Sequence, residues 1–254
     1  MANIGTVRSI TQVGTYEPFE LQVARGQITG HSTVNIYGLQ AVVTTTYIPI
    51  WENASAYTYP VAATTMHLAS SVNTGSDLTA KITIQGLDAS YNQISETIAL
   101  NGTTAVTTTK SYLRINSMNV ASGAPTGTIT LKDLTDTTTY AQINTTIGRT
   151  QMAIYTVPAG YTFYLSRIDA YTSANGYSAD YISYRNLSTT SNGVSSLSQQ
   201  APFTNTYHAQ RVMPRAFTEK TDIQLQARTS ANSYVVSIAA EGFLIANAIT
   251  GSVG

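Results

Sequence analysis

The 254-residue chain contains no cysteine. This absence excludes disulfide bridges, thiolate zinc sites and a cysteine nucleophile. Charge is also scarce, because Asp, Glu, Lys and Arg together make up 10% of the sequence, about half the usual share. The formal net charge is zero, and the basic residues stand singly along the chain. A nucleic-acid-binding protein normally carries a basic patch or stripe, so we expect no direct contact with nucleic acid.

Long apolar runs are missing as well. The two most apolar stretches, residues 41–51 and 242–249, fall well short of the roughly 18 residues that a membrane-spanning helix needs. The N-terminal sequence MANIGTVRSITQVG lacks the apolar segment of a signal peptide. We therefore expect no membrane segment and no secretion signal.

Threonine, serine, asparagine and tyrosine take the place of the charged residues. Thr and Tyr favour strands because branched and aromatic side chains pack well on a pleated surface. Asn, Ser and Gly favour turns. No stretch shows the apolar spacing of an amphipathic helix three turns long. Since 43% of the residues are hydrophobic, the chain is apolar enough to fold, and the composition predicts an all-β protein.

Residues 81–115, KITIQGLDASYNQISETIALNGTTAVTTTKSYLRI, are the clearest strand-forming stretch. Ile82 and Ile84 alternate with polar residues, and a second strand follows around Ile98. Asn101-Gly102 is a strong signal for a two-residue hairpin turn, because that turn needs positive φ at both positions. The stretch predicts three strands, and none of its residues suggests catalysis.

Residues 1–40 predict an N-terminal arm that includes a first strand. Pro18 fixes an extended entry, after which apolar side chains alternate toward one face. Two interpretations stay open. The segment is either the first strand of the first domain, or an extended arm that adds a strand to a neighbouring subunit. The candidate interaction residues are Tyr16, Phe19, Leu21, Val23 and Arg25.

Short strands with turn signals at roughly ten-residue spacing fill the remainder of the chain, a pattern typical of sandwiches. We expect a β-sandwich domain in residues 41–147 and a second, jelly-roll-like sandwich in residues 148–254. In the second half, Pro158-Ala159-Gly160 predicts a tight turn between two strands, and Asn192-Gly193 predicts a hairpin or loop tip.

No catalytic motif stands out. The chain has no nucleophile elbow, phosphate-binding loop or dinucleotide fingerprint, and its three histidines lack metal-binding spacing. Asp133 and Asp136 could help to hold a calcium ion, but a solvated turn is the simpler interpretation. A carboxylate pair for glycoside hydrolysis would meet in space rather than in sequence, and nothing nominates one. We expect no enzyme activity, no metal site and no cofactor.

The aromatic residues leave alternatives open. Trp51, the only tryptophan, either anchors a core or domain interface or forms a stacking platform for a sugar. The tyrosines of the second half either pack in the core and on strand surfaces or form a contact patch for a subunit or a host surface. These tyrosines are Tyr161, Tyr164, Tyr171, Tyr177, Tyr181, Tyr184 and Tyr207.

Three segments resemble structural proteins encoded by tailed bacteriophages of marine and freshwater bacteria. The segments are YEPFELQVARGQITGH (16–31), QGLDASYNQISETIALNGTTAVTTTKSYLR (85–114) and MAIYTVPAGYTFYL (152–165). The resemblance implies a virion protein that has no active site and is assembled in the cytoplasm of the bacterial host.

Within a virion, the resemblance implies a capsid decoration (cement) protein, with a neck, head-fibre or tail component, or a host-glycan-binding module, as alternatives. The implied partners are the major capsid protein or other virion proteins, and decoration proteins commonly form trimers. A cement protein removes apolar area from water at its contacts, at roughly 25 cal/mol per Å². We expect the arm around Phe19, Leu21 and Val23 to supply such a contact.

Overall fold

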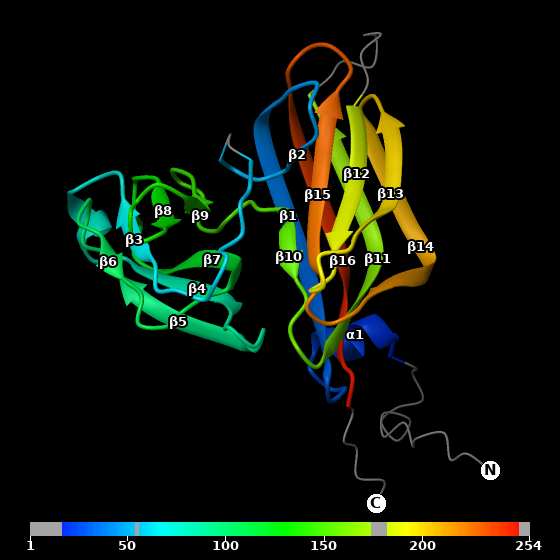
Figure 1. Ribbon diagram of the computed structural model, residues 1–254, viewed down its shortest axis with the longest axis horizontal. Coiled ribbons are helices and arrows are strands. Elements are labelled where there is room, and N and C mark those ends of the chain that lie inside the picture. The colour runs from blue at the N-terminus through cyan, green and yellow to red at the C-terminus, as the bar shows by residue number, and fades with distance from the viewer. Residues whose placement is uncertain (1–16, 54–55, 174–181, 249–254) are drawn as a thin grey trace, which may run out of the picture.

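The computed structural model of the chain describes residues 17–53, 56–173 and 182–248. Strands dominate these residues, which confirms the all-β prediction. Figure 1 shows two sandwiches side by side: a larger, upright one built from β1, β2 and β10–β16, and a smaller one built from β3–β9. No helix in the described residues is long and apolar enough to cross a membrane.

The larger sandwich consists of two antiparallel sheets. The first has the strand order β1 (His31–Val43), β16 (Tyr234–Ala246), β11 (Tyr161–Thr172) and β14 (Thr206–Phe217). The second has the order β10 (Ile154–Thr156), β15 (Asp222–Thr229), β12 (Ile182–Thr189) and β13 (Ser195–Phe203), and β2 (Ile48–Pro49) also pairs with β15. An apolar core that includes Phe163, Leu225 and Ile238 fills the space between them. Along the chain, β10 to β12 and β13 to β16 alternate between the sheets, whereas β12 and β13 form a hairpin within the second sheet.

The smaller sandwich is built in the same way. One sheet has the order β6 (Val106–Thr107), β3 (His67–Ser70), β8 (Ile129–Lys132) and β9 (Thr139–Ile143). The other has the order β5 (Gln93–Ala99), β4 (Lys81–Leu87) and β7 (Arg114–Ser122), and the short 3-10 helix η2 (Gly75–Leu78) precedes β4. In β4, Ile82 and Ile84 are buried, whereas Thr83 and Gln85 point outward, as the alternation predicts.

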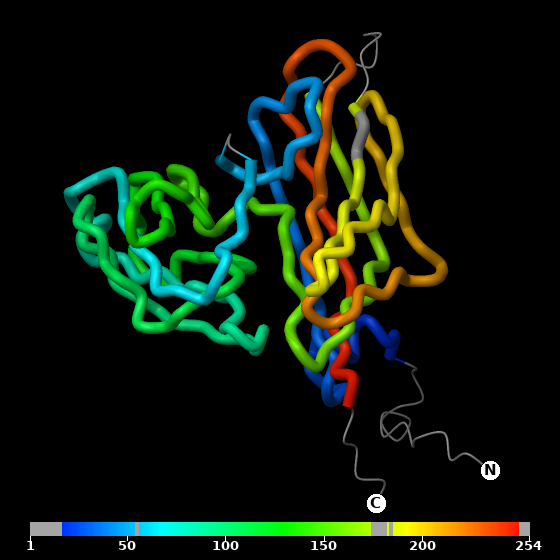
Figure 2. Tube along the Cα trace, in the orientation of Figure 1, coloured from blue at the N-terminus to red at the C-terminus, as the bar shows by residue number. Residues whose placement is uncertain are grey.

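The smaller sandwich is inserted in the sequence between β2 and β10, which together form one edge of the second sheet of the larger sandwich. β2 pairs with Gln226 and Ala227, and β10 pairs with residues 222–224, so the two strands lie end to end along the same edge of β15. Figure 2 shows the chain leaving the larger sandwich after β2 and returning before β10. A bridge between Trp51 and Met152 joins the outgoing and the returning segment.

The strand pairing corrects the predicted place of the early strands. The sequence assigns residues 1–40 to an arm and residues 41–147 to the first sandwich. β1 spans this boundary and pairs with β16, and β2 pairs with β15, so both strands belong to the larger sandwich. The partners of β1 lie near the other end of the sequence, which local patterning cannot show.

The segment after Pro18 is helical rather than extended, so the predicted strand there is wrong. Phe19–Ala24 form the short helix α1, in which the backbone amides of Leu21 and Gln22 both donate to the Pro18 carbonyl at 3.1 Å. Phe19 and Val23 stand four residues apart and therefore share a helix face. Val23 is buried, and the Phe19 ring lies 5.2 Å from that of Phe243 on β16.

Asn101-Gly102 does not form the predicted hairpin. β5 before it pairs with β4, and β6 after it pairs with β3, so this turn carries the chain from one sheet to the other. Gly102 has a φ of +61°, and its amide donates to the Asp77 carbonyl at 2.8 Å.

Two other predicted turns are confirmed. Pro158–Gly160 links β10 to β11, with Gly160 at a φ of +77°. Asn192-Gly193 lies at the tip of the β12–β13 hairpin, where Gly193 has a φ of +78°.

Candidate binding groove

A buried ion pair joins the two sandwiches. Arg114 on β7 donates from Nε and Nη2 to the two carboxylate oxygens of Asp222 on β15, at 2.8 and 3.0 Å. The hydroxyl of Thr156 donates to the same carboxylate at 2.6 Å, and Arg114 also donates to the Pro60 carbonyl at 3.2 Å. Burial alone would lower the pKa of Arg114, but the hydrogen bonds and charge of Asp222 outweigh burial and raise it. The guanidinium of Arg114 is therefore held in its charged form, and the pair is nearly saturated with hydrogen bonds.

An aromatic cluster packs around this pair. The Trp51 ring meets Tyr57 edge-on at 5.0 Å, Tyr57 meets Tyr59 at the same distance, and Arg114 stacks 4.5 Å above Tyr59. Trp51 is 1% exposed, which confirms its interpretation as an interface anchor, because a buried indole cannot stack on a sugar. The junction is a small core of its own.

Hydrogen bonds to backbone groups also connect the two sandwiches at the junction. The side chain of Asn116 on β7 donates to the Thr156 carbonyl at 3.1 Å and accepts from the Thr156 amide at 2.9 Å. The Ala159 amide donates to the Tyr91 carbonyl at 2.9 Å. Together with the ion pair, these bonds fix the orientation of one sandwich on the other.

A groove of about 690 Å³ opens beside this junction. One wall is β1, an edge strand of its sheet, from Ser32 to Tyr37. The other wall is the outer face of the β5–β4–β7 sheet, where Gln85 and Ser95 lie next to each other on paired strands. Of the described residues that line the groove, Arg149 is the one with a charge.

The groove therefore offers amide and hydroxyl groups, the single positive charge of Arg149 and apolar side chains such as Ile36 and Leu244. Ser117 donates to Gln85 at 3.0 Å, and Thr83 and Thr97 share a hydrogen bond of 2.9 Å on the same sheet face. Neighbouring side chains thus hold these polar groups in place. Such a lining can bind a neutral, hydroxyl-rich or amide-rich ligand, with Arg149 available for a single negative charge.

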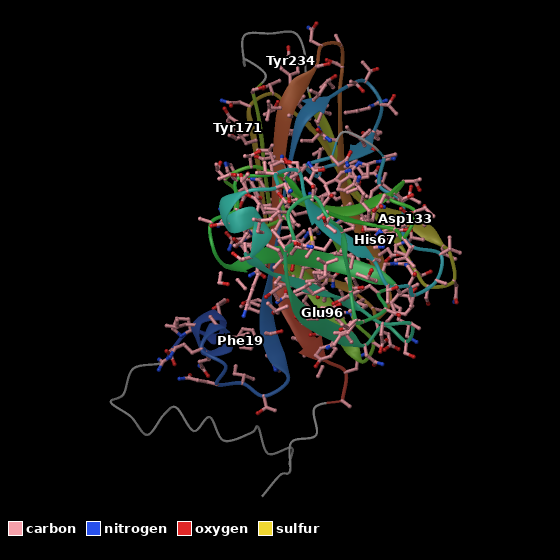
Figure 3. All side chains as sticks on the ribbon, turned by 90° about the vertical axis from the view of Figure 1, so that its left-hand side faces the viewer. Phe19, His67, Glu96, Asp133, Tyr171 and Tyr234 are labelled. Carbon is pink, nitrogen blue, oxygen red and sulfur yellow. The ribbon has the colours of Figure 1, made fainter. Side chains whose placement is uncertain are left out.

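The predicted interaction residues lie elsewhere, at the lower end of the larger sandwich. Figure 3 shows Phe19 at that end, opposite Tyr171 and Tyr234 at the upper end. Val23 is buried against its own chain and cannot contact a partner, and Arg25 forms an ion pair with Glu17 at 2.5 Å. Phe19 and Leu21 remain exposed. Tyr16 lies outside the described residues.

The tyrosines of the second half differ in their exposure. Tyr171 is exposed on β11, whereas Tyr161 and Tyr207 pack partly against the core of the larger sandwich. Tyr177 and Tyr181 lie outside the described residues.

The Asp133–Asp136 turn behaves as a solvated turn. Asp133 accepts hydrogen bonds from the hydroxyls of Thr135 and Thr137 and from the amides of Thr137 and Thr138, which holds the pKa of its carboxyl below the ordinary value. Asp136 instead contacts His67 at 3.1 Å. In the part of the chain that the structure describes, no group of three or more His, Asp or Glu side chains could hold a metal ion.

Glu52 at the junction is a titrating group that the sequence did not reveal. Burial raises the pKa of its carboxyl to about 7, although the amides of Gln151 and Asn144 act to lower it. A raised pKa means that the folded chain binds a proton more tightly than the unfolded chain, whose carboxyl titrates near 4.5. The stabilisation is complete below pH 4.5 and is lost as the pH rises through about 7.

We expect the free energy of unfolding to fall by about 1–3 kcal/mol across this pH range, and we expect Glu52→Gln to remove that fall. Denaturant unfolding at several pH values measures both. Glu241→Gln, at an exposed position on β16, is the matched control for the exchange of a carboxyl for an amide. An unchanged pH dependence in Glu52→Gln would rule out Glu52 as its source.

Comparisons with known proteins give little further guidance. No protein-family model and no curated protein matches the chain. A chain from the structure of infectious bursal disease virus Gx strain is 11% identical, with 94% of this chain and 79% of that chain covered and a TM-score of 0.21. A chain from the Gt strain structure is 9% identical, with 85% and 73% covered and a TM-score of 0.21. Similarity at this level carries no argument about fold or function.

Proposed function

We propose that the chain is a structural protein of a bacteriophage virion, most specifically a capsid decoration protein bound to the outer shell. The observation that carries this proposal is the junction between the sandwiches. Arg114, Asp222 and the aromatic cluster around Trp51 hold the two sandwiches as one rigid body. A rigid body anchored through one sandwich keeps the other at a fixed position, which suits a part that bridges neighbouring subunits.

The sequence resemblance supports the same proposal. It covers the segments 16–31, 85–114 and 152–165, which lie in both sandwiches and in α1. The major capsid protein or another virion protein is then the partner, and the chain acts without a catalytic step.

Imaging of the virus particle tests this proposal. For a decoration protein, density that fits the two-sandwich body should repeat over the whole shell. Copies confined to one vertex would instead assign the chain to the neck or tail. Absence of the chain from purified particles would overturn the proposal altogether.

Glycan binding in the groove is a second candidate function, and the polar lining between β1 and the β5–β4–β7 sheet favours it. A glycan-binding screen of the purified chain should then give hits that Gln85→Ala and Arg149→Ala each weaken. Thr135→Ala, on the exposed turn after β8, is a control that should keep them. A screen without hits would remove this candidate and leave the virion proposal untouched.

A further inference from the structure

The edge strand β14 carries an exposed apolar projection. Leu165 of β11 pairs with Arg215, and Arg167 pairs with Gln210, so residues 211–214 bulge out opposite the single residue Ser166. Within the bulge, Val212 is 100% and Met213 is 83% exposed. Large apolar side chains that are almost fully exposed at a sheet edge are typical of a surface that a partner covers.

The chemistry around the projection favours docking through side chains. Pro214 has no amide hydrogen, and a bulge interrupts the regular edge, so a further strand cannot simply pair here. Arg211 and Arg215 flank the two apolar residues. Arg211 donates from Nη2 to Gln199, while its Nε is buried without a hydrogen-bond partner in the described residues. The projection is therefore apolar at its tip and positively charged on both sides.

α1 presents the complementary surface. Phe19 is 37% and Leu21 is 47% exposed, and Glu20 between them is exposed too. The structure shows no ion pair for Glu20 within the described residues, whereas Glu17 already pairs with Arg25. Buried Val23 and the contact of Phe19 with Phe243 on β16 hold the helix against the larger sandwich. Leu21 stands two residues from Phe19 and therefore points away from the sandwich, so Leu21 and Glu20 form the outward surface of α1. That surface is apolar with a negative charge, the reverse of the projection.

The two surfaces lie at the same level of one sheet. Tyr164 of β11 pairs with Phe243 of β16 on one side and with Ala216 of β14 on the other. Phe243 contacts α1, and Ala216 directly follows the bulge and its flanking arginine. Two complementary surfaces at equal height on one molecule can engage two neighbours head to tail, and such a contact closes into a ring when the rotation between neighbours divides a full turn.

We propose that the Val212–Met213 projection of one copy docks on α1 of a second copy. Val212 and Met213 cover Leu21 of the neighbour, and Arg215 or Arg211 pairs with its Glu20. The contact does not depend on any virion partner, so it can be tested on the purified chain alone.

The first test measures the mass of the full chain in solution against its concentration. The native chain should associate, and Val212→Ser combined with Met213→Ser should weaken association by roughly tenfold or more. Both side chains are exposed, so the variant should keep the melting temperature of the native chain. Val61→Ser, at a fully exposed valine in the segment leading to β3, is the matched control and should leave the mass unchanged.

A charge exchange gives the second test. Glu20→Arg and Arg215→Glu should each weaken association, and the chain that carries both changes should regain it, because opposite charges then face each other again. Rescue by the double variant identifies the two surfaces as partners. A native chain that stays monomeric at high micromolar concentration, or an oligomer that none of these variants affects, would overturn the proposal.

Discussion

Arg114→Ala should destabilise the chain by about 3–5 kcal/mol, because it leaves the Asp222 carboxylate buried without its counter-charge. The side chains of the pair are only 11% and 12% exposed, so water cannot replace the guanidinium. The Pro60 carbonyl loses a donor, and the Tyr59 ring loses the cation stacked on it. Denaturant unfolding measures the loss, and the transition midpoint should shift with little change in slope.

Two further variants separate the ion pair from other effects of the substitution. Arg149→Ala removes an exposed arginine from the groove and should change the free energy of unfolding by no more than about 0.5 kcal/mol. Replacing both partners, with Arg114→Met and Asp222→Leu, should recover most of the loss, because no charge is then left buried alone. A cost below about 1 kcal/mol for Arg114→Ala would show that the pair does not hold the junction.

Gly38→Ala should cost about 3 kcal/mol, because β1 passes too close to the split edge strand for any side chain. A methyl group at residue 38 would lie 2.2 Å from the Ile50 carbonyl oxygen and 2.5 Å from the Ala153 amide nitrogen. These two groups form the 2.8 Å hydrogen bond that joins the two halves of that strand. The substitution therefore pushes Ile50 and Ala153 apart at the place where the smaller sandwich is attached to the larger one.

Gly148→Ala is the control for this prediction, since nothing lies within 4 Å of a methyl group added there. We expect its thermal unfolding to match that of the native chain, while Gly38→Ala melts at a clearly lower temperature. Equal melting temperatures for the two variants would mean that β1 has room to move away from the edge strand.

The sequence predicts those features that neighbouring residues determine. The alternation of Ile82 and Ile84 with polar residues in β4 is local, and so is the turn at Pro158–Gly160. α1 escaped prediction because Phe19, Leu21 and Val23 fit a strand period as well as one helical turn, and six residues are too few to separate the two.

The candidate site is not predictable in this way. Arg114 and Asp222 form an ion pair although they stand 108 residues apart in the sequence. The sequence around each residue gives no sign of its partner. The groove likewise combines β1 with residues from β4, β5 and β7, which are ordinary polar positions in their own strands. Of the predicted interaction residues, the structure leaves Phe19 and Leu21 exposed and buries Val23.

The pairing of β1 with β16 constrains the order in which the chain folds during synthesis. His31 pairs with Ile245, so the first sheet of the larger sandwich cannot close before residue 245 has left the ribosome. The strand pairings and bridges within the smaller sandwich fall between Thr64 and Arg149, so this sandwich can fold first. β1 stays unpaired until β16 has been synthesised. Its polar residues Ser32, Thr33 and Asn35 reduce the risk that it aggregates before then.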